Sequence, residues 1–276
     1  MRLALLGTCI GESRSPSLHM EEAKAQGIEL HYELIDFDQI GGDCAIFGQV
    51  LTDLQRQGYG GVNVTHPFKQ KALKFVDDLS PDAALIGSVN TIVFRNGRRE
   101  GFNTDWSGYV EAFQREFNGA CLDHVVQIGA GGAGAAVAYA LLQLGAKHLE
   151  IFELDEELGG RVVANLSKSN PGRVILGKNL VASTWNASGL VNCTPVGMAK
   201  YPGLPVPAPL LRASMWVSDI IYFPRETELL RLAKSAGARA SNGSIMNIYQ
   251  GAYGFELFTG MRANVERMLR RHCLEV

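Results

Sequence analysis

Apolar and polar positions alternate in short blocks over the first hundred residues. A period of two indicates a half-buried strand, and a period near 3.6 indicates a helix. These periods predict strands at Leu3–Leu6, His31–Phe37, Gly61–Val64, Val89–Phe94 and Glu100–Phe102. They predict helices at Leu18–Gln26, Ala45–Gln57, Gln70–Val76 and Pro81–Gly87. The opening order of strand, helix, strand, helix, strand indicates an α/β unit of its own.

A second series of blocks follows a long amphipathic helix at Trp106–Phe117. Its predicted strands are Val125–Ile128, His148–Phe152, Arg173–Leu176, Gly189–Asn192 and Trp216–Tyr222. Its predicted helices are Ala135–Leu144, Glu156–Ser169 and Glu228–Ala236, with a helical tail at Gly243–Gly260 and Arg262–Cys273. Regular alternation of strands and helices favours an α/β architecture with a parallel sheet.

The strongest local motif lies between the strand ending at Ile128 and the next helix. Gly129-Ala130-Gly131-Gly132-Ala133-Gly134 has the spacing G-x-G-x-x-G. The first glycine allows the tight turn, the second lets a pyrophosphate approach, and the third lets the helix pack closely. Glu153 follows the next strand, where an acid binds a ribose 2′-hydroxyl. A purely structural glycine turn is the alternative, but this context favours a Rossmann-type dinucleotide site.

Two domains are therefore expected. Residues 1–106 would form a substrate-binding and catalytic domain, with 241–276 packing back on it. Residues 107–240 would form the Rossmann dinucleotide-binding domain. A length of 276 residues suits this division.

Composition narrows the class of protein. A net charge of −2 gives no reason to expect a nucleic-acid or membrane partner. The five cysteines are scattered and form no CxxC pair, so we expect neither a disulfide framework nor a zinc site, and no metal. The strand begins directly after Met1-Arg2, which argues against a signal peptide, and no apolar run is long enough to span a membrane. A cytoplasmic enzyme acting on a small molecule is the expectation.

Polar side chains gather in the loops of the first domain. Ser13 and Ser15 lie just before a helix, where two hydroxyls and a helix N-terminus can hold a carboxylate. The alternative is that Ser15 caps the helix and Pro16 starts it. Asn63 and Thr65 share one face of an extended segment that leads to Lys69. A lysine near a helix start opposes the helix dipole, which hints at a function, although a surface lysine remains the default.

Further polar groups follow other predicted strands. Asn90 stands beside Thr91 at a strand end, and Asp105 follows Asn103-Thr104. Polar groups collected at strand ends of an α/β sheet form the usual ligand crevice. Asp105 could instead be a helix N-cap. His66 could act as a base, and Cys193 could be reactive, but a structural ring and a packed thiol are the simpler interpretations.

At this point the chain resembles the shikimate dehydrogenase family, including its quinate/shikimate members. The resemblance covers nearly the whole chain, with the motifs in the family's order. The motifs are Ser13-Arg14-Ser15-Pro16, Asn63-Val64-Thr65-His66-Pro67-Phe68-Lys69, Gly87-Ser88-Val89-Asn90-Thr91, Asn103-Thr104-Asp105, Gly129–Gly134, Asn192-Cys193-Thr194-Pro195-Val196-Gly197-Met198 and Gln250.

The resemblance implies a role for each of these groups. Lys69 and Asp105 would be the catalytic pair, because a lysine amine can take the hydroxyl proton as hydride leaves for the nicotinamide. Ser13, Ser15 and Tyr222 would hold the substrate carboxylate. The ring hydroxyls would be bound by Thr65, Asn90, Asp105 and Gln250, and Asn63 would also be substrate-binding. The cofactor would contact Gly129, Ala130, Gly131, Gly132, Ala133, Gly134, Glu153, Leu154, Asp155, Thr194, Pro195, Val196, Gly243 and Met246.

Two departures from the family pattern refine this expectation. Many NADP-using members carry Asn-Arg-Thr after the second Rossmann strand, and this chain has Glu153-Leu154-Asp155. A carboxylate repels a 2′-phosphate and bonds to a free 2′-hydroxyl, so NAD is expected over NADP. Quinate-using members often carry threonine at the position of Ser15, so serine favours shikimate. The alternatives are a quinate or aminoshikimate dehydrogenase and a non-catalytic nucleotide-binding regulator. A monomer or a homodimer is compatible with the sequence.

Overall fold

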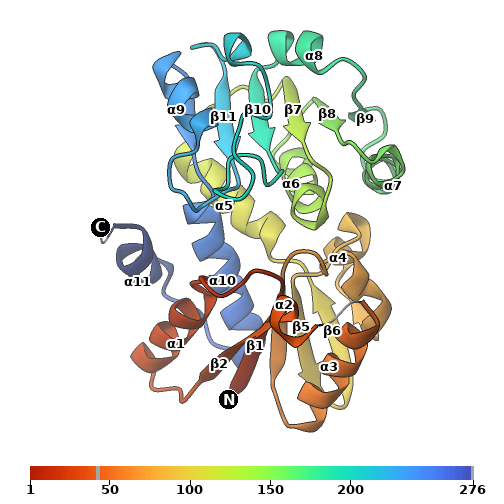
Figure 1. The fold of residues 1–276 in the computed structure, drawn as a ribbon, viewed down its shortest axis with the longest axis vertical. Helices are drawn as coiled ribbons and strands as arrows, with labels where there is room; N and C mark the ends of the chain where they lie inside the picture. The colour runs from red at the N-terminus through yellow and green to blue at the C-terminus, as the bar shows by residue number, and fades with distance from the viewer. Residues whose placement is uncertain (42–43, 275–276) are drawn as a thin grey trace. The chain divides into compact units, whose positions relative to one another are not determined.

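The computed structural model describes residues 1–41 and 44–274, and the chain divides into two compact units (Figure 1). Unit 1 comprises Met1–Asp105 and Ile248–Val276, and unit 2 comprises Trp106–Asn247. Residues 42–43 and 275–276, which fall in the predicted first domain, lie outside the described residues, as do the side chains of Cys44 and Cys273. Residues 241–247 belong to unit 2 rather than to the first domain, because the last strand of unit 2 ends only at Ser241.

The strands of the described residues form two six-stranded sheets, one in each unit. The sheet of unit 1 has the order β2-β1-β3-β5-β6-β4. Its strands are β1 (Arg2–Gly7), β2 (His31–Asp36), β3 (Gly61–Val64), β4 (Asp78–Leu79), β5 (Thr91–Arg95) and β6 (Arg98–Phe102). The helical segments are α1 (Ser15–Ala25), α2 (Phe37–Ile40), α3 (Cys44–Arg56), η1 (Lys71–Phe75), α4 (Pro81–Ile86), α10 (Ser244–Thr259), α11 (Val265–Leu269) and η3 (Arg270–Leu274).

Alternate residues of β1 build the two cores of unit 1. Leu3 and Leu5 pack on one face with Phe255 of α10, and Ala4 and Leu6 pack on the other with Phe47 of α3. This is the period of two that predicted the strand. Figure 1 shows α1 and α10 on one side of this sheet and α3 on the other.

The sheet of unit 2 is wholly parallel, with the order β12-β11-β10-β7-β8-β9. Read from β9, this is the doubly wound order 3-2-1-4-5-6 of a Rossmann domain. The strands are β7 (His124–Ile128), β8 (His148–Phe152), β9 (Val174–Leu176), β10 (Gly189–Asn192), β11 (Trp216–Asp219) and β12 (Arg239–Ser241). The helices are α5 (Asp105–Glu116), α6 (Gly132–Gln143), α7 (Glu156–Ser167), α8 (Leu180–Asn186), η2 (Ala208–Leu210) and α9 (Glu228–Ser235). The predicted two-domain α/β class is confirmed.

Helices cover both faces of the second sheet. Leu229 and Leu230 of α9 pack with Val126, Leu190 and Val217 on one face. On the other face, Phe113 of α5 meets Trp216 edge-on with 4.9 Å between ring centroids. A sheet buried on both faces explains why its strands read as continuous apolar runs rather than as alternating ones.

Some predicted elements were wrong in kind or extent. Gln70–Val76 is a single 3₁₀ segment, η1, rather than an α-helix. The strand predicted at Trp216–Tyr222 ends at Asp219, because the Asp219 carboxylate accepts the Ile221 N–H and turns the chain out of the sheet. Helix α11 starts at Val265, after Asn264 caps it, rather than at Arg262. The short elements α2, β4, α8 and β12 were not predicted.

Over the described residues, no helix combines the length and the apolar character needed to cross a bilayer.

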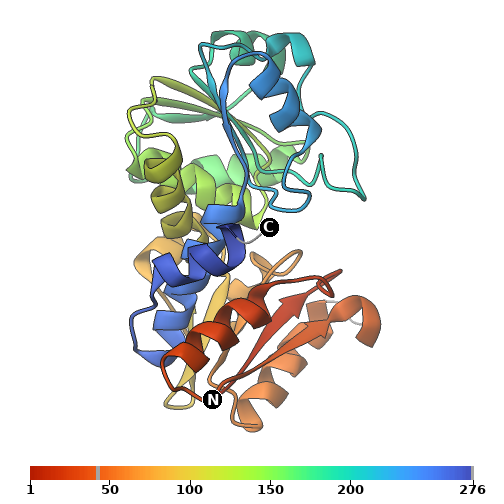
Figure 2. The ribbon, with the colours of Figure 1, turned by 90° about the vertical axis from the view of Figure 1, so that its left-hand side faces the viewer.

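A buried ion pair ties the C-terminal segment to α1. The Glu22 side chain is fully buried and accepts hydrogen bonds from Arg267 Nε at 2.8 Å and Nη2 at 2.6 Å. It also accepts from the Asn264 N–H and from Gln26. Figure 2 shows the C-terminal helical segment beside α1. Burial opposes ionisation of Glu22, but these hydrogen bonds outweigh it and lower its pKa.

Replacing Glu22 with glutamine is expected to lower the free energy of unfolding by about 3 kcal/mol, the lower end of the cost of breaking a buried ion pair, because Arg267 is partly exposed. Urea denaturation at pH 7 measures this. Glu21→Gln on the same helix is the matched control, because Glu21 forms an exposed pair with Arg271 and should change stability by less than about 0.5 kcal/mol.

The pH dependence follows from the lowered pKa of Glu22. Its stabilisation is complete above the ordinary value of 4.5 and is lost as pH falls through the lower folded value. The difference between wild type and Glu22→Gln should therefore shrink below pH 4.5. A difference that stays constant down to pH 3 would contradict this assignment.

Candidate active site

Many of the predicted catalytic and substrate residues lie at one end of the strands of the unit 1 sheet. Strands β1 and β3 are parallel, so the loops after Gly7 and Val64 leave at the same edge. Strand β5 runs antiparallel to both β3 and β6, so its start lies beside their ends. Asn90 directly precedes β5, whereas the sequence analysis placed it at a strand end. Because β5 is antiparallel to its neighbours, Asn90 still lies at the same end of the sheet as the loops after Gly7 and Val64.

Lys69 and Asp105 form a direct ion pair at this edge. Lys69 Nζ lies 2.6 Å from Asp105 Oδ2, and the two side chains are 15% and 6% exposed. The neighbouring Phe68 is buried against Phe37 and Phe47, with ring centroids 4.5 and 4.9 Å away. The Lys69 carbonyl accepts the Val89 N–H at 2.8 Å. The lysine is therefore held at its backbone and at its ammonium.

Asn90 orients the carboxylate of the pair. Its Nδ2 donates to Asp105 Oδ1 and to Thr104 Oγ1, both at 2.9 Å. Its Oδ1 accepts the Thr104 N–H at 2.8 Å. Asp105 is the first residue of α5 and not its N-cap, and its own N–H donates to Asn103 Oδ1. One carboxylate oxygen thus bonds Asn90, and the other bonds Lys69.

A buried chain of hydrogen bonds lies under this pair. Tyr32 Oη donates to Asn63 Oδ1 at 2.7 Å, and Asn63 Nδ2 donates to Thr91 Oγ1 at 3.0 Å and to the Asn90 carbonyl at 3.3 Å. Thr91 in turn donates to Asn90 Oδ1. Both amide hydrogens of Asn63 are used within the protein, so Asn63 supports Asn90 rather than presenting donors to a substrate. Its role as a direct substrate ligand stays a prediction.

His19 packs on the buried end of this chain. Its ring stacks on Tyr32 with 5.0 Å between centroids, and the residue is 1% exposed. Burial lowers the pKa of His19 to about 4, so the ring is neutral at physiological pH. The neutral His19 ring therefore packs against Tyr32, the first donor of the hydrogen-bond chain.

The serines and Thr65 lie in neighbouring loops of unit 1. Ser13 Oγ donates to Ser15 Oγ at 3.2 Å, so the two predicted carboxylate ligands are adjacent. Ser15 is the first residue of α1, and Arg14 occupies the N-cap without a side-chain cap, which excludes the simple capping role for Ser15. Thr65 packs against Gly7. A Cβ added to Gly7 would lie only 2.3 Å from the Thr65 methyl group.

His66 is exposed in the loop that leads to Lys69. Desolvation, together with the charges of Lys69 and Lys71, lowers the pKa of His66. This shift favours the neutral ring, the form that a structural role and a base both use.

The last two predicted substrate residues lie on different units. Gln250, on α10, belongs to unit 1 and accepts from Asn90 Nδ2 at 3.4 Å, so it joins the Lys69–Asp105 group. Tyr222 belongs to unit 2 and is 39% exposed.

The glycine loop of unit 2 has the geometry that its sequence predicted. Gly129 has φ of +94° and lies against Cys193, whose carbonyl oxygen would be 2.8 Å from an added Cβ. An added Cβ at Gly134 would lie 2.4 Å from the Gly129 oxygen, so this glycine allows the close approach of α6. An added Cβ at Gly131 would meet nothing within 4 Å, which leaves that side of the loop open.

Glu153 is coupled directly to this loop. Its Oε2 accepts the Ala130 N–H at 2.7 Å, and its Oε1 accepts the Leu154 N–H at 2.8 Å. Asp155 accepts the Leu158 N–H as the N-cap of α7, and the Leu154 side chain is fully exposed. Glu153 is thus hydrogen-bonded to the glycine loop itself.

The loop after β10 lies beside the glycine loop at the point where the strand order reverses. Open α/β sheets bind ligands at this switch point. Asn192 Oδ1 accepts from the N–H and the hydroxyl of Thr194, and Asn192 Nδ2 donates to the Val196 carbonyl. These bonds hold Thr194 and Val196 in one loop, and Thr194 lies against Gly129. Desolvation and the Asp219 carboxylate raise the pKa of the Cys193 thiol, as expected of an unreactive cysteine.

Asp219 holds this loop through hydrogen bonds to its side chain. The sequence analysis did not identify Asp219 as a residue of the site. Its carboxylate accepts from Asn192 Nδ2 at 3.1 Å and from Thr227 Oγ1 at 2.7 Å. Burial raises the pKa of Asp219 to about 6. Asp219 is the last residue of the apolar strand β11, and a polar residue at a strand end is the same signal that identified the polar residues of unit 1.

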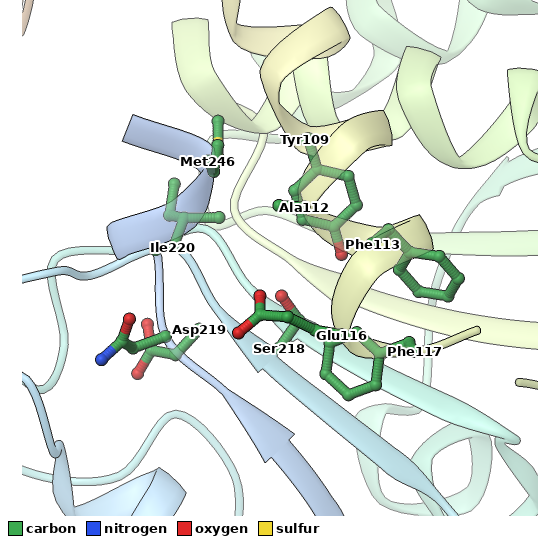
Figure 3. A pocket seen from close by; sticks show the side chains of 11 residues that line it. Tyr109, Ala112, Phe113, Glu116, Phe117, Ser218, Asp219, Ile220 and Met246 are labelled. Carbon is green, nitrogen blue, oxygen red and sulfur yellow. The ribbon is translucent and has the colours of Figure 1, made fainter. Parts of the chain in front are cut away.

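A pocket in unit 2 contains both predicted nicotinamide-side residues, Gly243 and Met246 (Figure 3). The α5 side chains Tyr109 and Glu116 point into it from one side, and the end of β11 lines the other. Burial raises the pKa of Glu116. A Cβ at Gly243 would come within 2.0 Å of the Ile220 carbonyl oxygen, so this glycine is required for packing.

Comparisons with known proteins bear on both units. Residues 5–92 match the family model "Shikimate dehydrogenase substrate binding domain", and residues 246–271 match "Shikimate 5'-dehydrogenase C-terminal domain". The chain is 43% identical to the shikimate dehydrogenase (NADP(+)) of Streptomyces avermitilis over 97% of this chain and 93% of that protein. It is 38% identical to the quinate/shikimate dehydrogenase (NAD(+)) of Corynebacterium efficiens over 96% of this chain and 95% of that protein.

A solved structure shares the whole fold. Quinate dehydrogenase from Corynebacterium glutamicum, in complex with NAD, superimposes with a TM-score of 0.90 at 35% identity and covers 100% of this chain and 99% of that one. The identity of the relatives and their coverage of both units show that this chain belongs to the shikimate dehydrogenase family of oxidoreductases.

Proposed function

We propose that the protein is an NAD-preferring shikimate dehydrogenase, which interconverts shikimate and 3-dehydroshikimate. The Lys69–Asp105 ion pair carries this proposal, because it sets an ammonium donor in a mostly buried, polar-lined position. Unit 1 would bind the cyclic hydroxy acid through Ser13, Ser15, Thr65 and Gln250, and unit 2 would bind the dinucleotide.

Proton transfer is the task of Lys69. A bound NADH would supply the hydride for the ketone carbon, and Lys69 Nζ would give the proton that the developing alkoxide needs. In the oxidation direction the same nitrogen takes the proton from the hydroxyl. Asp105 and Asn90 fix the lysine so that little reorganisation is needed.

The preference for NAD follows from the acid after β8. Glu153 accepts three backbone N–H groups and lies at the glycine loop, where the ribose of a bound dinucleotide is expected. A carboxylate there bonds a 2′-hydroxyl and repels a 2′-phosphate. Relatives named for each cofactor match this chain, so the local residues are the better guide to the choice.

Quinate is the second candidate substrate. The NAD complex of a quinate dehydrogenase is structurally similar over the full chain, which favours this candidate. Ser15, where the family pattern of quinate users has threonine, favours shikimate.

The protein would act on small molecules without a nucleic-acid or membrane partner, as a monomer or homodimer. We place it in the cytoplasm, because the cysteines are scattered along the sequence and form no CxxC pair, which suits a reducing compartment.

Steady-state kinetics with shikimate, quinate and aminoshikimate, each with NAD and NADP, should give the highest kcat/KM for shikimate with NAD. The NAD preference should exceed about tenfold, because one charge-assisted hydrogen bond contributes about 1.5–3 kcal/mol. A higher kcat/KM for quinate would reassign the substrate, and a higher value with NADP would refute the cofactor argument. Tight NAD binding without turnover of any of the three acids would indicate a regulator.

A further inference from the structure

Two histidines and a glutamate converge at the start of the Rossmann sheet. His124 and His148 are the first residues of β7 and β8 and face each other across the parallel ladder. Glu150 stands two residues after His148, so its side chain lies on the same face of the strand. One ligand atom from each residue lies within 4.8 Å of the other two.

The contacts within this cluster are close to those of a metal site. His148 Nε2 lies 3.2 Å and His124 Nε2 lies 3.6 Å from the same oxygen, Glu150 Oε1. Ligand atoms on a tetrahedral Zn²⁺ are about 3.3 Å apart, given Zn–N and Zn–O distances near 2.0–2.1 Å. The two distances to Glu150 Oε1 are therefore close to those between zinc ligands, and the two histidine ligand atoms lie within 4.8 Å of each other.

His124 gives the cluster a feature that a simple His–Glu pair lacks. Its Nε2 is buried and makes no hydrogen bond, because 3.6 Å to Glu150 is too long for one. A hydrogen bond between His148 and Glu150 explains their 3.2 Å contact but leaves the His124 nitrogen unsatisfied. A cation at the centre would satisfy all three atoms.

The surroundings hold the three ligands in place. Ser183 of α8 donates to the second oxygen of Glu150, Oε2, and so orients the carboxylate. Ser188 bonds both the N–H and the carbonyl of His124. Lys147, the nearest lysine in sequence, is paired with Asp123 at 2.7 Å and does not bind the cluster carboxylate. Support of this kind around the ligands is typical of functional metal sites.

We propose that His124, His148 and Glu150 bind a divalent transition metal of the zinc type, with water at the remaining position. Two imidazoles and one carboxylate are the donor set that Zn²⁺ accepts. The glycine loop follows the other end of β7, about 15 Å away at 3.3 Å per residue. The metal would therefore fasten the starts of β7 and β8, beside α8 in Figure 1, and would take no part in hydride transfer.

The sequence could not show this site. Its ligands come from two strands separated by more than twenty residues, and cysteine spacing, which argued against zinc, says nothing about histidine and glutamate. Only the parallel pairing of His124 with His148 brings them together.

The experiment uses the full-length, tag-free protein, stripped with EDTA and then titrated with Zn²⁺ against a chelating dye. We expect one tight Zn²⁺ per chain and a rise in Tm on addition of metal. His148→Ala should weaken binding at least about tenfold and abolish the rise in Tm, and Ser183→Ala should weaken binding about tenfold. Co²⁺ should show the intense visible bands of a tetrahedral site in wild type and lose them in His148→Ala.

His31→Ala is the matched control. His31 Nε2 also lies 3.6 Å from a carboxylate, that of Glu29, but both side chains are strongly exposed. Binding should be unchanged in this variant. Equal loss in His31→Ala and His148→Ala, or wild-type binding no tighter than that of His148→Ala, would overturn the proposal. If His148→Ala does not fold, His124→Gln takes its place, and the wild-type stoichiometry and Co²⁺ spectrum remain decisive.

Discussion

Replacing Lys69 with alanine is expected to lower kcat about 10²–10⁴-fold, the usual contribution of a positioned general acid or base. KM for shikimate should change much less, because the serine, threonine and glutamine groups that would bind the ring are untouched. Stopped-flow or steady-state assays at saturating NAD measure both constants. The fold should persist, because Asp105 keeps its 2.9 Å bond from Asn90 and its place at the start of α5.

The control is Lys71→Ala, two residues further on. Lys71 is exposed and lies near the Phe68 ring at 5.8 Å rather than at Asp105. Its removal should leave kcat within about twofold, because a surface substitution away from the site has a small effect.

A merely structural role for Lys69 would give a different pattern. Small primary amines added to Lys69→Ala should restore part of kcat if the missing group is a proton carrier. A variant that folds, binds NAD and turns over at the wild-type rate would refute the catalytic assignment.

Local signals made unit 2 largely predictable. The apolar strands His148–Phe152 and Gly189–Asn192 came out at their observed bounds, because both are short, apolar and flanked by loop residues. The glycine motif fixed the position of the turn between β7 and α6. Strand β12 was missed because Arg239-Ala240-Ser241 has no β-branched or aromatic residue, and it forms a strand only by pairing with β11.

The candidate site of unit 1 was predictable in composition but not in connectivity. Strand-end polarity and family resemblance pointed to Lys69, Asp105 and Asn90. The bonds from Tyr32 to Asn63 and from Asn63 to Thr91 join residues about thirty positions apart, so no local pattern could show them. Because these bonds are invisible in the sequence, Asn63 was expected only as a substrate residue. Its amide also donates hydrogen bonds to the Asn90 carbonyl and to Thr91.

Long-range ion pairs were equally invisible in the sequence. Glu22 and Arg267 are 245 residues apart, and neither stands out in its own helix. Periodicity indicates which face of α1 is buried, but not which charge from the C-terminal segment will meet a carboxylate there.

Exchanging Glu153-Leu154-Asp155 for Asn-Arg-Thr is expected to reverse the cofactor preference. Removing the Glu153 carboxylate ends its repulsion of a 2′-phosphate, and the arginine supplies a charge-assisted bond of about 1.5–3 kcal/mol. The ratio of kcat/KM for NADP to that for NAD should therefore rise at least about tenfold, and about 100-fold if both effects add.

The structure accommodates each of these three changes. Leu154 is fully exposed, so an arginine fits there without a clash. Threonine can replace Asp155 as the N-cap of α7, because its hydroxyl oxygen can also accept the hydrogen bond that the Leu158 N–H donates. Loss of the Glu153 bond to the Ala130 N–H loosens the glycine loop, so kcat/KM with NAD should fall as well.

Glu156→Gln is the matched control for the charge change. Glu156 is an exposed acid in the first turn of α7, one residue beyond the exchanged segment. Neutralising it should leave the cofactor ratio within about twofold, because an exposed charge interacts weakly through water and is further screened by salt. An equal shift in Glu156→Gln would mean that general acidity selects the cofactor. No shift in the triple variant would mean that Glu153 does not face the adenosine ribose.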